Sequence, residues 1–364
     1  MTCTVVRRVL LARGADLDSN TGLGRAHAAV VSLLEKTLVK DWTKAGTIEH
    51  KESKNIFSRV LNRWHNHPTL VESRANSSTA DLLHITDQEQ AHLVPKNTLI
   101  PVAVTVHDLF HIQPRKLNVG DTMIKVGDMN PNFVRKMDIN KLKKGLERAD
   151  LLICISESTR QEVKRLFPGK LTALVRHQID VDYWNPETNP KPSKLISDFY
   201  DPNKCLIITV GSDEPRKRLN LVETIISCLP SEVSDEINVV NIGSNLKLSD
   251  EQLVAAFQYA NALIFPSVSE GFGYPPAEAM AAGCPVIASD SAAHNEIIPK
   301  NCLLPLDELR AWVDAVERVH TDWKKNAGGP RHHNLNLIEH VRNMLSPQAH
   351  GVALSNAYDL LFEE

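Results

Sequence analysis

The residues between Pro266 and Asp290, PSVSEGFGYPPAEAMAAGCPVIASD, contain two carboxylates, Glu270 and Glu278, eight positions apart. Paired carboxylates serve as acid and base in glycoside hydrolysis, and a carboxylate also accepts hydrogen bonds from hydroxyl groups. Two glycines and two prolines between them predict a loop whose backbone N–H groups can approach a ligand. ALIFPS before the loop has the pattern of a strand, and AEAMAAG after it that of a helix. We therefore expect Glu270 at the strand end and Glu278 in the first helical turn, where the helix dipole favours a carboxylate. Helix capping alone would explain Glu278 but not Glu270.

A second segment, GSDEPRKRLNLV from Gly211 to Val222, also follows a predicted strand. Arg216 and Lys217 fall where the next helix should begin, and positive side chains there oppose the helix dipole. A bound anion would remove this conflict, because Arg and Lys hold phosphate oxygens well. The segment predicts a phosphate contact, with a solvated basic turn as the alternative.

Two further segments follow or end predicted strands. In DSNTGLGRAHAAVV, Gly22 and Gly24 match two glycines of a dinucleotide-binding fingerprint, but His27 stands at the third position. Because the fingerprint is incomplete, the segment predicts one of two simpler features. It is either a helix N-terminus whose backbone N–H groups could hold an anion, or a tight turn between strand and helix. In VTVHDLFHIQP, His107 ends an apolar strand at the sheet edge where open α/β sheets bind ligands. A local hydrogen-bonding role is the alternative for His107.

The elements that must position these residues alternate between strand and helix. Ten apolar runs have the pattern of strands buried on both faces, namely RVLLARG, DLLHITD, IPVAVTVHDL, LLICIS, LTALVRH, CLIITVG, INVVNIGS, ALIFPS, CPVIASD and NCLLPL. Helical stretches such as AHAAVVSLLEKTL and DEQLVAAFQYA lie between them, which predicts parallel sheets covered by helices. Residues 184–203 interrupt the pattern with four prolines. We therefore expect an N-terminal domain at 1–183, a linker at 184–203 and a second domain at 204–345.

Composition narrows the possible functions. A chain of 364 residues suits two domains, and a formal charge of −3 does not favour nucleic acid as a partner. The six cysteines lack metal-ligand spacing and indicate free thiols in a reducing compartment. The Asp-x-Asp triplets at 16–18 and 180–182 have a form that holds a divalent metal in some sugar transferases. Because so short a motif recurs by chance, we expect no metal site. No apolar run is long enough to predict a membrane span.

The run from 248 to 298 closely resembles the donor-binding half of family 4 glycosyltransferases, which are glycosyl transferases of group 1. The resemblance rests on the Glu-x7-Glu motif with EGFG and on the EAMAAGCPV that follows. VGSDEPRKRLNLV is similar to the family's phosphate-binding segment, and TVHDLF and LLICISESTRQEV are similar to segments of its N-terminal domain. In VRHQIDVDYWNP the chain departs from the family's usual Asn-Gly-Val-Asp. The resemblance implies the α/β GT-B fold, in which two doubly wound Rossmann-like domains face each other. It also implies that a C-terminal helix, here 346–364, crosses back to the N-terminal domain.

The resemblance implies a role for each candidate residue. Glu278 would bind the ribose of a nucleotide donor, and Glu270 would meet the transferred sugar near its 3-hydroxyl. Arg216 and Lys217 would hold the diphosphate and stabilise its charge as the glycosidic bond breaks. His107 would contact the donor sugar. Further donor contacts would come from Gly22, Gly24, Phe272, Gly273, Tyr274 and Pro275.

These roles predict a retaining hexosyltransferase that needs neither a metal nor another cofactor. The expected donor is GDP-mannose, with UDP-glucose next, and the expected acceptor is a glycan or a lipid-linked saccharide. A nucleotide-sugar epimerase, a phosphorylase and a non-catalytic sugar-nucleotide or glycan-binding module stay open. The expected location is cytoplasmic. The basic helix predicted at 135–148 would allow peripheral contact with the inner face of a membrane. For Phe57, Val60, Leu61 and Trp64, core packing is expected, with a helix at a membrane interface as the alternative.

Overall fold

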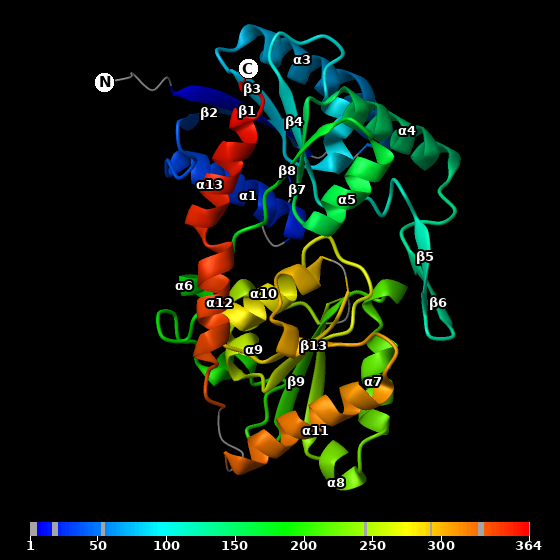
Figure 1. Cartoon of the computed structure of the whole chain (residues 1–364), viewed down its shortest axis with the longest axis vertical. Helices are drawn as coiled ribbons and strands as arrows, with labels where there is room; N and C mark the ends of the chain where they lie inside the picture. Colours follow the sequence, from blue (N-terminus) through cyan, green and yellow to red (C-terminus); the bar gives the residue numbers. More distant parts are fainter. Residues whose placement is uncertain are drawn as a thin grey trace. The chain divides into compact units, whose positions relative to one another are not determined.

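The computed structural model describes residues 6–16, 21–51, 55–243, 246–291, 293–326 and 331–363, with side chains omitted at 56–58. The chain divides into two compact units. Unit 1 comprises Met1–Pro114, Gly127–Gln178 and Pro347–Glu364, and unit 2 comprises Arg115–Val126 and Ile179–Ser346. Each unit contains one parallel sheet with helices packed on it (Figure 1). The predicted α/β class with two doubly wound sheets is confirmed.

Unit 1 is built on a six-stranded sheet in the order β2-β1-β3-β4-β7-β8. Its strands are β1 (Arg7–Ala15), β2 (Trp42–His50), β3 (Leu82–Ile85), β4 (Val102–Val106), β7 (Leu151–Cys154) and β8 (Leu171–Leu174). Its α-helices are α1 (Gly22–Glu35), α2 (Ile56–Leu61), α3 (His67–Ser77), α4 (Phe133–Arg148), α5 (Glu157–Leu166) and α13 (Pro347–Asp359). A π-helix, η1 (Asn62–Asn66), and a 3₁₀ helix, η2 (Gln88–Leu93), complete it.

The strands of unit 1 are buried on both faces because helices cover both faces. In β1, Val9 and Leu11 belong to one apolar cluster, and Leu10 and Ala12 to another, as the two-residue repeat of a strand requires. The first cluster includes side chains of α1 and α13, and the second includes side chains of α3, α4 and α5. This two-sided burial explains why the strands appear in the sequence as continuous apolar runs.

The C-terminal helix α13 packs within unit 1, beside α1 and β1 although it lies at the other end of the chain (Figure 1). The Trp42 indole N–H donates to Asp359 Oδ1 at 3.0 Å, and the Trp42 and Tyr358 ring centroids lie 5.0 Å apart. Tyr358 itself is fully buried. The helix therefore contributes side chains to the core of this unit.

Unit 2 is built on a five-stranded parallel sheet in the order β10-β9-β11-β12-β13. Its strands are β9 (Cys205–Gly211), β10 (Ile237–Gly243), β11 (Ala262–Phe265), β12 (Val286–Ser289) and β13 (Leu303–Leu304). Its α-helices are α6 (Val181–Trp184), α7 (Leu219–Ser227), α8 (Ser231–Ser234), α9 (Asp250–Tyr259), α10 (Tyr274–Ala281), α11 (Leu309–Lys325) and α12 (Leu335–Leu345). Four 3₁₀ helices complete it, namely η3 (Ser193–Ile196), η4 (Pro215–Lys217), η5 (His294–Glu296) and η6 (Lys300–Cys302).

The proline-rich segment 184–203 packs on unit 2. Ile196 is 1% exposed, and the Gln258 side-chain amide on α9 donates to the carbonyls of Trp184 and Asn189 at 2.9 and 3.0 Å. These side-chain hydrogen bonds satisfy backbone carbonyl groups in a segment whose prolines prevent regular backbone hydrogen bonding.

A β-hairpin, β5 (Arg115–Val119) and β6 (Thr122–Val126), leaves the sequence of unit 1 and joins unit 2. Its two-residue turn places Gly120 at φ +52°. The sequence analysis missed this hairpin and the edge strand β2, because their strands mix polar with apolar residues instead of running apolar. The Gly-Asp pair between alternating stretches is a hairpin signal that could have revealed β5 and β6.

One packing expectation is wrong. Val60 and Leu61 are 38% and 45% exposed rather than buried in a core, and Trp64 is half-buried. The side chain of Phe57 lies outside the described residues. In the described part of the chain, no helix combines the length and apolar character that crossing a membrane requires.

Candidate functional site

The loops after β9 and β11 meet at the carboxyl edge of the unit 2 sheet. These strands are neighbours, with Ile207 paired to Ala262, and β10 lies on the other side of β9. The strand order therefore reverses between β9 and β11. Open α/β sheets bind ligands in the crevice at such a switch point. The loops that follow these two strands carry Arg216, Lys217 and Glu270.

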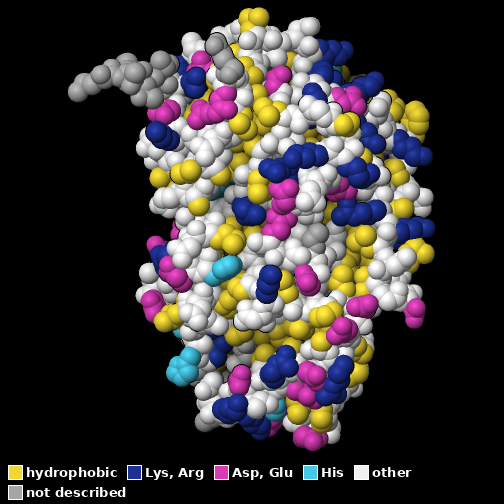
Figure 2. Space-filling model, in the orientation of Figure 1, with side chains coloured by type: hydrophobic (Ala, Val, Ile, Leu, Met, Phe, Trp, Pro, Cys, Tyr) yellow, Lys and Arg dark blue, Asp and Glu magenta, His cyan; other side chains and the backbone are white. Residues whose placement is uncertain are grey.

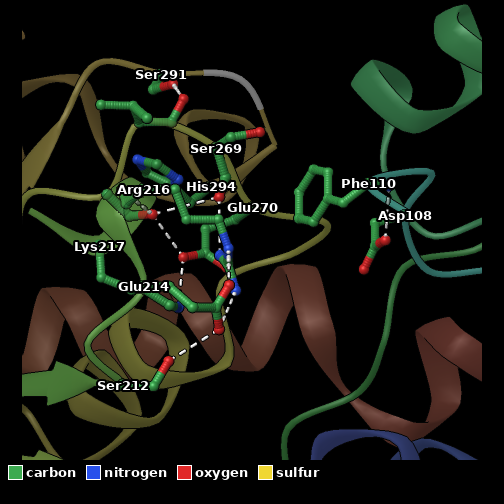
Figure 3. Close-up of polar contacts among 12 residues, drawn as sticks. Asp108, Phe110, Ser212, Glu214, Arg216, Lys217, Ser269, Glu270, Ser291 and His294 are labelled. Atoms are coloured by element: carbon green, nitrogen blue, oxygen red, sulfur yellow. Dashed lines mark hydrogen bonds and ion pairs between the residues drawn. The ribbon is translucent and has the colours of Figure 1, made fainter. Parts of the chain in front are cut away.

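These three side chains form one ion cluster (Figure 3). Lys217 Nζ donates to Glu270 Oε1 at 2.6 Å, and Arg216 Nη1 lies 2.9 Å from Glu270 Oε2. The side chains are only 11–13% exposed, so solvent screens the charges weakly. Residues 53 positions apart in the sequence are thus held in direct contact.

Glu270 is ionised in this setting. Burial by itself raises the pKa of its carboxyl group, but the charges of Lys217 and Arg216 and hydrogen bonds from Lys217 and Ser267 lower it to about 2. The Ser267 hydroxyl donates to Oε1 at 2.6 Å. A fully charged carboxylate is suited to accept hydrogen bonds from ligand hydroxyls, and it holds both cations in place when no anion is bound.

Backbone contacts fix the two loops to each other. Val268 N–H donates to the Arg216 carbonyl at 2.9 Å, and Arg216 Nη1 donates to the Ser269 carbonyl at 3.0 Å. Lys217 lies against Gly211, where a Cβ atom would come 3.3 Å from the lysine Cγ. The lysine ammonium also sits 5.2 Å from the centre of the Phe265 ring. These contacts join the two loops and position the charged side chains before a ligand binds, as transition-state electrostatics require.

Arg216 and Lys217 lie in the 3₁₀ turn η4, just before α7, close to the helix start that was expected for them. A second acid, Glu214, pairs with Arg216 through Oε2 and Nε at 2.8 Å. The sequence analysis did not single out Glu214, although it lies within GSDEPRK, two positions before the arginine. Its side chain is 54% exposed, which makes it the more easily displaced partner of Arg216.

The position predicted for Glu278 is wrong by one turn. Helix α10 begins at Tyr274, so Glu278 is its fifth residue and no acid lies in the first turn. The two prolines were assigned to the loop, but Pro is tolerated in a first helical turn because its missing N–H is not needed there. Glu278 is 4% exposed. It is a buried carboxylate on the helix that follows β11.

The turn before α10 depends on Gly273. Its φ of +108° is unfavourable for other residues, and a Cβ atom there would lie 2.8 Å from the Cβ of His294. Phe272 is 4% exposed, whereas Tyr274 and Pro275 are half-buried. The glycine thus lets this loop close onto the segment after β12.

That segment holds a residue that the sequence analysis missed. His294 is fully buried, and its Nε2–H donates to the Ser289 carbonyl at 2.8 Å. Its buried Nδ1 has no hydrogen-bond partner within the described residues. Burial lowers the pKa of His294, while the negative charge of Glu270 opposes that shift. A histidine in DSAAHN directly after a strand is the same kind of signal that drew attention to His107.

The predicted residues of unit 1 occupy a different environment. Gly22 and Gly24 lie inside the first turn of α1, and the Gly24 N–H already donates to Thr21 Oγ1 at 3.0 Å. His27 bridges Thr86 Oγ1 at 2.8 Å and Glu49 Oε1 at 3.0 Å. Burial lowers the pKa of His27 to about 4, so this ring is neutral at pH 7. Helix α1 therefore offers an anion fewer unpaired backbone N–H groups than its two glycines suggested.

His107 is 6% exposed, and both of its ring nitrogens have protein partners. Nε2–H donates to the Thr86 carbonyl at 3.0 Å, and Nδ1 lies 3.1 Å from His177 Nε2. Burial lowers the pKa of His107, which favours the neutral ring. A sugar contact through His107 stays a prediction, and it would require one of these hydrogen bonds to be exchanged.

The described residues contain no group of three or more His, Cys, Asp or Glu side chains placed to hold a metal ion. In the triplet at 180–182, Asp182 pairs with Arg342 at 3.2 Å. In the triplet at 16–18, residues 17 and 18 lie outside the described residues.

Comparison with known proteins identifies the segment that carries the ion cluster. Residues 201–322 match the family model described as glycosyl transferases group 1. This match covers about a third of the 364 residues. The predicted family resemblance is confirmed, and the matched residues include Arg216, Lys217, Glu270 and Glu278.

Two curated mannosyltransferases are similar to this chain. The serotype-specific mannosyltransferase WbdA of Escherichia coli is 26% identical over 241 residues, which cover 59% of this chain and 27% of WbdA. The O-antigen chain mannosyltransferase RfbU of Salmonella typhimurium is 30% identical over 130 residues, covering 35% of this chain and 33% of RfbU. The matches thus span about a quarter to a third of the length of these relatives.

Two solved structures share the fold of this chain. Sucrose-phosphate synthase from Thermosynechococcus elongatus superposes with a TM-score of 0.67 at 18% identity, covering 98% of this chain and 99% of that chain. The Anabaena protein HepE in complex with UDP-glucose superposes with a TM-score of 0.63 at 13% identity, over the same shares of the two chains. The predicted GT-B fold is confirmed.

Proposed function

We propose that the protein is a retaining hexosyltransferase that moves a hexose from a nucleoside diphosphate sugar to a glycan or lipid-linked acceptor without a metal. The observation that carries this proposal is the cluster of Arg216, Lys217 and Glu270 at the switch point of the unit 2 sheet. It places two cations and one ionised carboxylate where open α/β sheets bind ligands. The family of the segment 201–322 and the two mannosyltransferase relatives support it.

The chemistry follows from the charges. When the bond between the anomeric carbon and the diphosphate oxygen breaks, negative charge develops on the diphosphate. Arg216 and Lys217 would give up their ion pairs with Glu270 and bind the phosphate oxygens instead, which would stabilise that charge. Glu270, released from its ion pairs, would accept hydrogen bonds from the hexose hydroxyls. The acceptor hydroxyl would attack the same face, and its proton would pass to the departing phosphate.

The donor proposed is GDP-mannose, with UDP-glucose as the second choice. Mannose is supported by the names of WbdA and RfbU, and UDP-glucose by the complex of HepE. Glu278 would bind the ribose from the second turn of α10, and the backbone from Phe272 to Pro275 would line the sugar–phosphate site. The five described cysteines are free thiols, which supports the proposed cytoplasmic location.

The proposal is tested by assaying the purified protein with a panel of nucleotide sugars, with and without EDTA. We expect transfer or slow donor hydrolysis that EDTA does not abolish, and an unchanged anomeric configuration by NMR. Glu270→Ala and Lys217→Ala should each lose at least about 10²-fold in turnover. Lys204→Ala is the matched control, because this exposed lysine precedes β9 at the opposite sheet edge.

Several outcomes would overturn the assignment. Near wild-type turnover in both site variants would remove these residues from the site. An epimerised nucleotide sugar formed without acceptor would identify an epimerase, and phosphorolysis would identify a phosphorylase. Nucleotide binding without any turnover, measured by calorimetry, would identify a non-catalytic binding module.

Peripheral membrane contact is part of the proposal. Helix α4 exposes Phe133, Val134 and Met137 at 76%, 54% and 40%, with exposed Lys136 and Lys144 on the same helix. Figure 2 shows Lys and Arg side chains gathered, with hydrophobic ones among them, over the part of unit 1 that carries α4. Such a surface favours anionic lipid.

Flotation with phosphatidylglycerol vesicles should recover the wild-type protein but not the Phe133→Ser/Met137→Ser variant. Leu99→Ser, at an 87% exposed apolar residue elsewhere in unit 1, is the control. Equal flotation of all three proteins, or none of the wild type, would contradict membrane contact through α4.

A further inference from the structure

Unit 1 has a cavity of about 180 Å³ at the switch point of its own sheet. The cavity is lined by the last residues of β1, by the π-helix η1 and by η2, which follows β3. β1 and β3 are neighbours, and β2 lies on the other side of β1, so the strand order reverses there. This is the place in an open α/β sheet where ligands bind. None of the residues assigned to the donor lines this cavity.

Arginines supply the permanently charged side chains that line the cavity. Arg13, Arg59 and Arg63 line it, and no described lining residue is Asp or Glu. The acids that accompany two of these arginines lie outside the lining. Glu49 Oε1 is 3.9 Å from Arg13 Nε, and Asp138 Oδ1 accepts from Arg63 Nε at 2.9 Å. A small enclosed space lined by cations concentrates the field and selects an anion.

Two polar atoms of the lining residues have no hydrogen-bond partner among the described residues. Arg13 is 3% exposed, and its Nε has no hydrogen-bond partner within the described residues. His92 is 9% exposed, and its Nδ1 is likewise unsatisfied there. A buried donor without an acceptor costs about 1–3 kcal/mol, and more when it is charged. A ligand oxygen in the cavity would accept from the Arg13 guanidinium and lower that cost.

Arg63 is held ready for a ligand. Its Nε and Nη2 both donate to the Asp138 carboxylate, at 2.9 and 3.0 Å, which fixes the plane of the guanidinium. Within the described part of the chain, its Nη1 has only a long contact, 3.4 Å, to Gln90 Oε1. Gln90 can approach because Gly14 has no side chain, since a Cβ there would lie 2.4 Å from Gln90 Oε1. One edge of the guanidinium is thereby kept at the cavity without further loss of conformational freedom on binding.

We propose that this cavity binds a phosphoryl group of the saccharide acceptor, which rests on the glycosyl transfer proposed above. Guanidinium groups recognise phosphate oxygens through paired N–H donors, and three of them suit an anion that carries more than one charge. The phosphoryl group has two possible sources. It belongs either to a soluble sugar phosphate or to the diphosphate of a lipid-linked saccharide.

The test measures binding by calorimetry, independently of turnover. The probes are mannose 1-phosphate, farnesyl diphosphate and the neutral methyl mannoside, each titrated into the 364-residue protein with the Lys217→Met substitution. That substitution weakens the other phosphate-binding site. In this background Arg59→Gln, at an exposed arginine, is compared with Arg74→Gln, an exposed arginine of α3 that does not line the cavity.

We expect Arg59→Gln to raise the Kd of the phosphorylated probe about ten-fold and Arg74→Gln to leave it unchanged, with no binding of methyl mannoside. Tighter binding of mannose 1-phosphate identifies a soluble sugar phosphate as the source of the phosphoryl group. Tighter binding of farnesyl diphosphate identifies a lipid-linked saccharide as the source. Equal Kd values in both variants, equal binding of methyl mannoside, or no binding of either phosphorylated probe would overturn the proposal. GDP binding that is lost in Lys217→Met but kept in Arg59→Gln tests the donor site separately.

Discussion

The ion cluster of Lys217, Arg216 and Glu270 makes a quantitative prediction about the ligand-free protein. The pKa of Glu270 falls from an ordinary 4.5 to about 2 because burial, which raises it, is outweighed by the two cations. One pKa unit corresponds to 1.36 kcal/mol, so the folded state favours the ionised carboxylate by about 3 kcal/mol. The groups are only 11–13% exposed, so solvent screening does not reduce this value greatly.

The perturbation is Glu270→Gln, which keeps the shape of the side chain and removes its charge. At pH 7 we expect it to lower the free energy of unfolding of unit 2 by about 3 kcal/mol, because two buried cations lose their partner. Combining it with Lys217→Met should reveal a coupling of about 1–2 kcal/mol, since the two cations share the interaction. The double variant should therefore be more stable than the sum of the single losses predicts.

The pH dependence has a defined sign. The folded pKa lies below the unfolded pKa, so the stabilisation is complete above about pH 4.5 and is lost as the pH falls toward 2. At pH 3 the difference between wild type and Glu270→Gln should have shrunk by about 2 kcal/mol.

The assay is urea unfolding read by pulsed hydrogen exchange and mass spectrometry on peptides of β9 and β11. It reports on unit 2 without assuming that both units unfold together. Glu236→Gln is the control, because Glu236 pairs with the exposed Lys324 at the surface of the same unit and its loss should matter far less. Equal stability of wild type and Glu270→Gln at pH 7, or a difference that does not shrink in acid, would refute the ion cluster.

Two further predictions concern unit 1. Burial lowers the pKa of His84 to about 3 and of His350 to about 4, so the unfolded chain takes up protons below pH 6.5 while the folded rings stay neutral. The stability of unit 1 should therefore fall between pH 6.5 and 4, and His350→Leu should reduce the slope by about 1.4 kcal/mol per pH unit. An unchanged slope in hydrogen exchange of α13 peptides would contradict this. Gly351→Ala places a Cβ atom 2.2 Å from the Leu38 carbonyl oxygen and should destabilise the docking of α13 by about 1–3 kcal/mol, whereas the exposed Val352→Ala should not. Equal exchange of α13 in both variants would show that the helix is not held at this contact.

The class of the fold and the segments that bear chemistry could be read from local patterns. Runs such as CLIITVG and ALIFPS are apolar throughout because both faces of the sheet are covered, and this requirement is visible residue by residue. The ends of those runs locate the loops after β9 and β11, and with them Arg216 and Glu270. The motif EGFG with EAMAAGCPV is equally local.

Weaker local patterns misled the prediction. The hairpin of β5 and β6 and the edge strand β2 are partly exposed, so their mixture of polar and apolar residues does not stand out from a loop. Helix α10 starts earlier than expected because its two prolines fit a first turn as well as a loop. For such segments the choice between loop, strand and helix depends on the residues that pack against them. A short stretch of sequence does not contain that information.

By itself the sequence determined two parallel α/β sheets, their candidate loops and the residue types at the proposed donor site. Only the tertiary structure decided which side chains meet. Strand order brings Lys217 to Glu270 across 53 residues, and places Arg13 and Arg63 on one cavity with a histidine of η2. It also revealed His294 and the internal hydrogen bonds of His107. The physical reason is that burial and helix or strand periodicity act between near neighbours, whereas the partners of a charge are set by the order in which the strands pair.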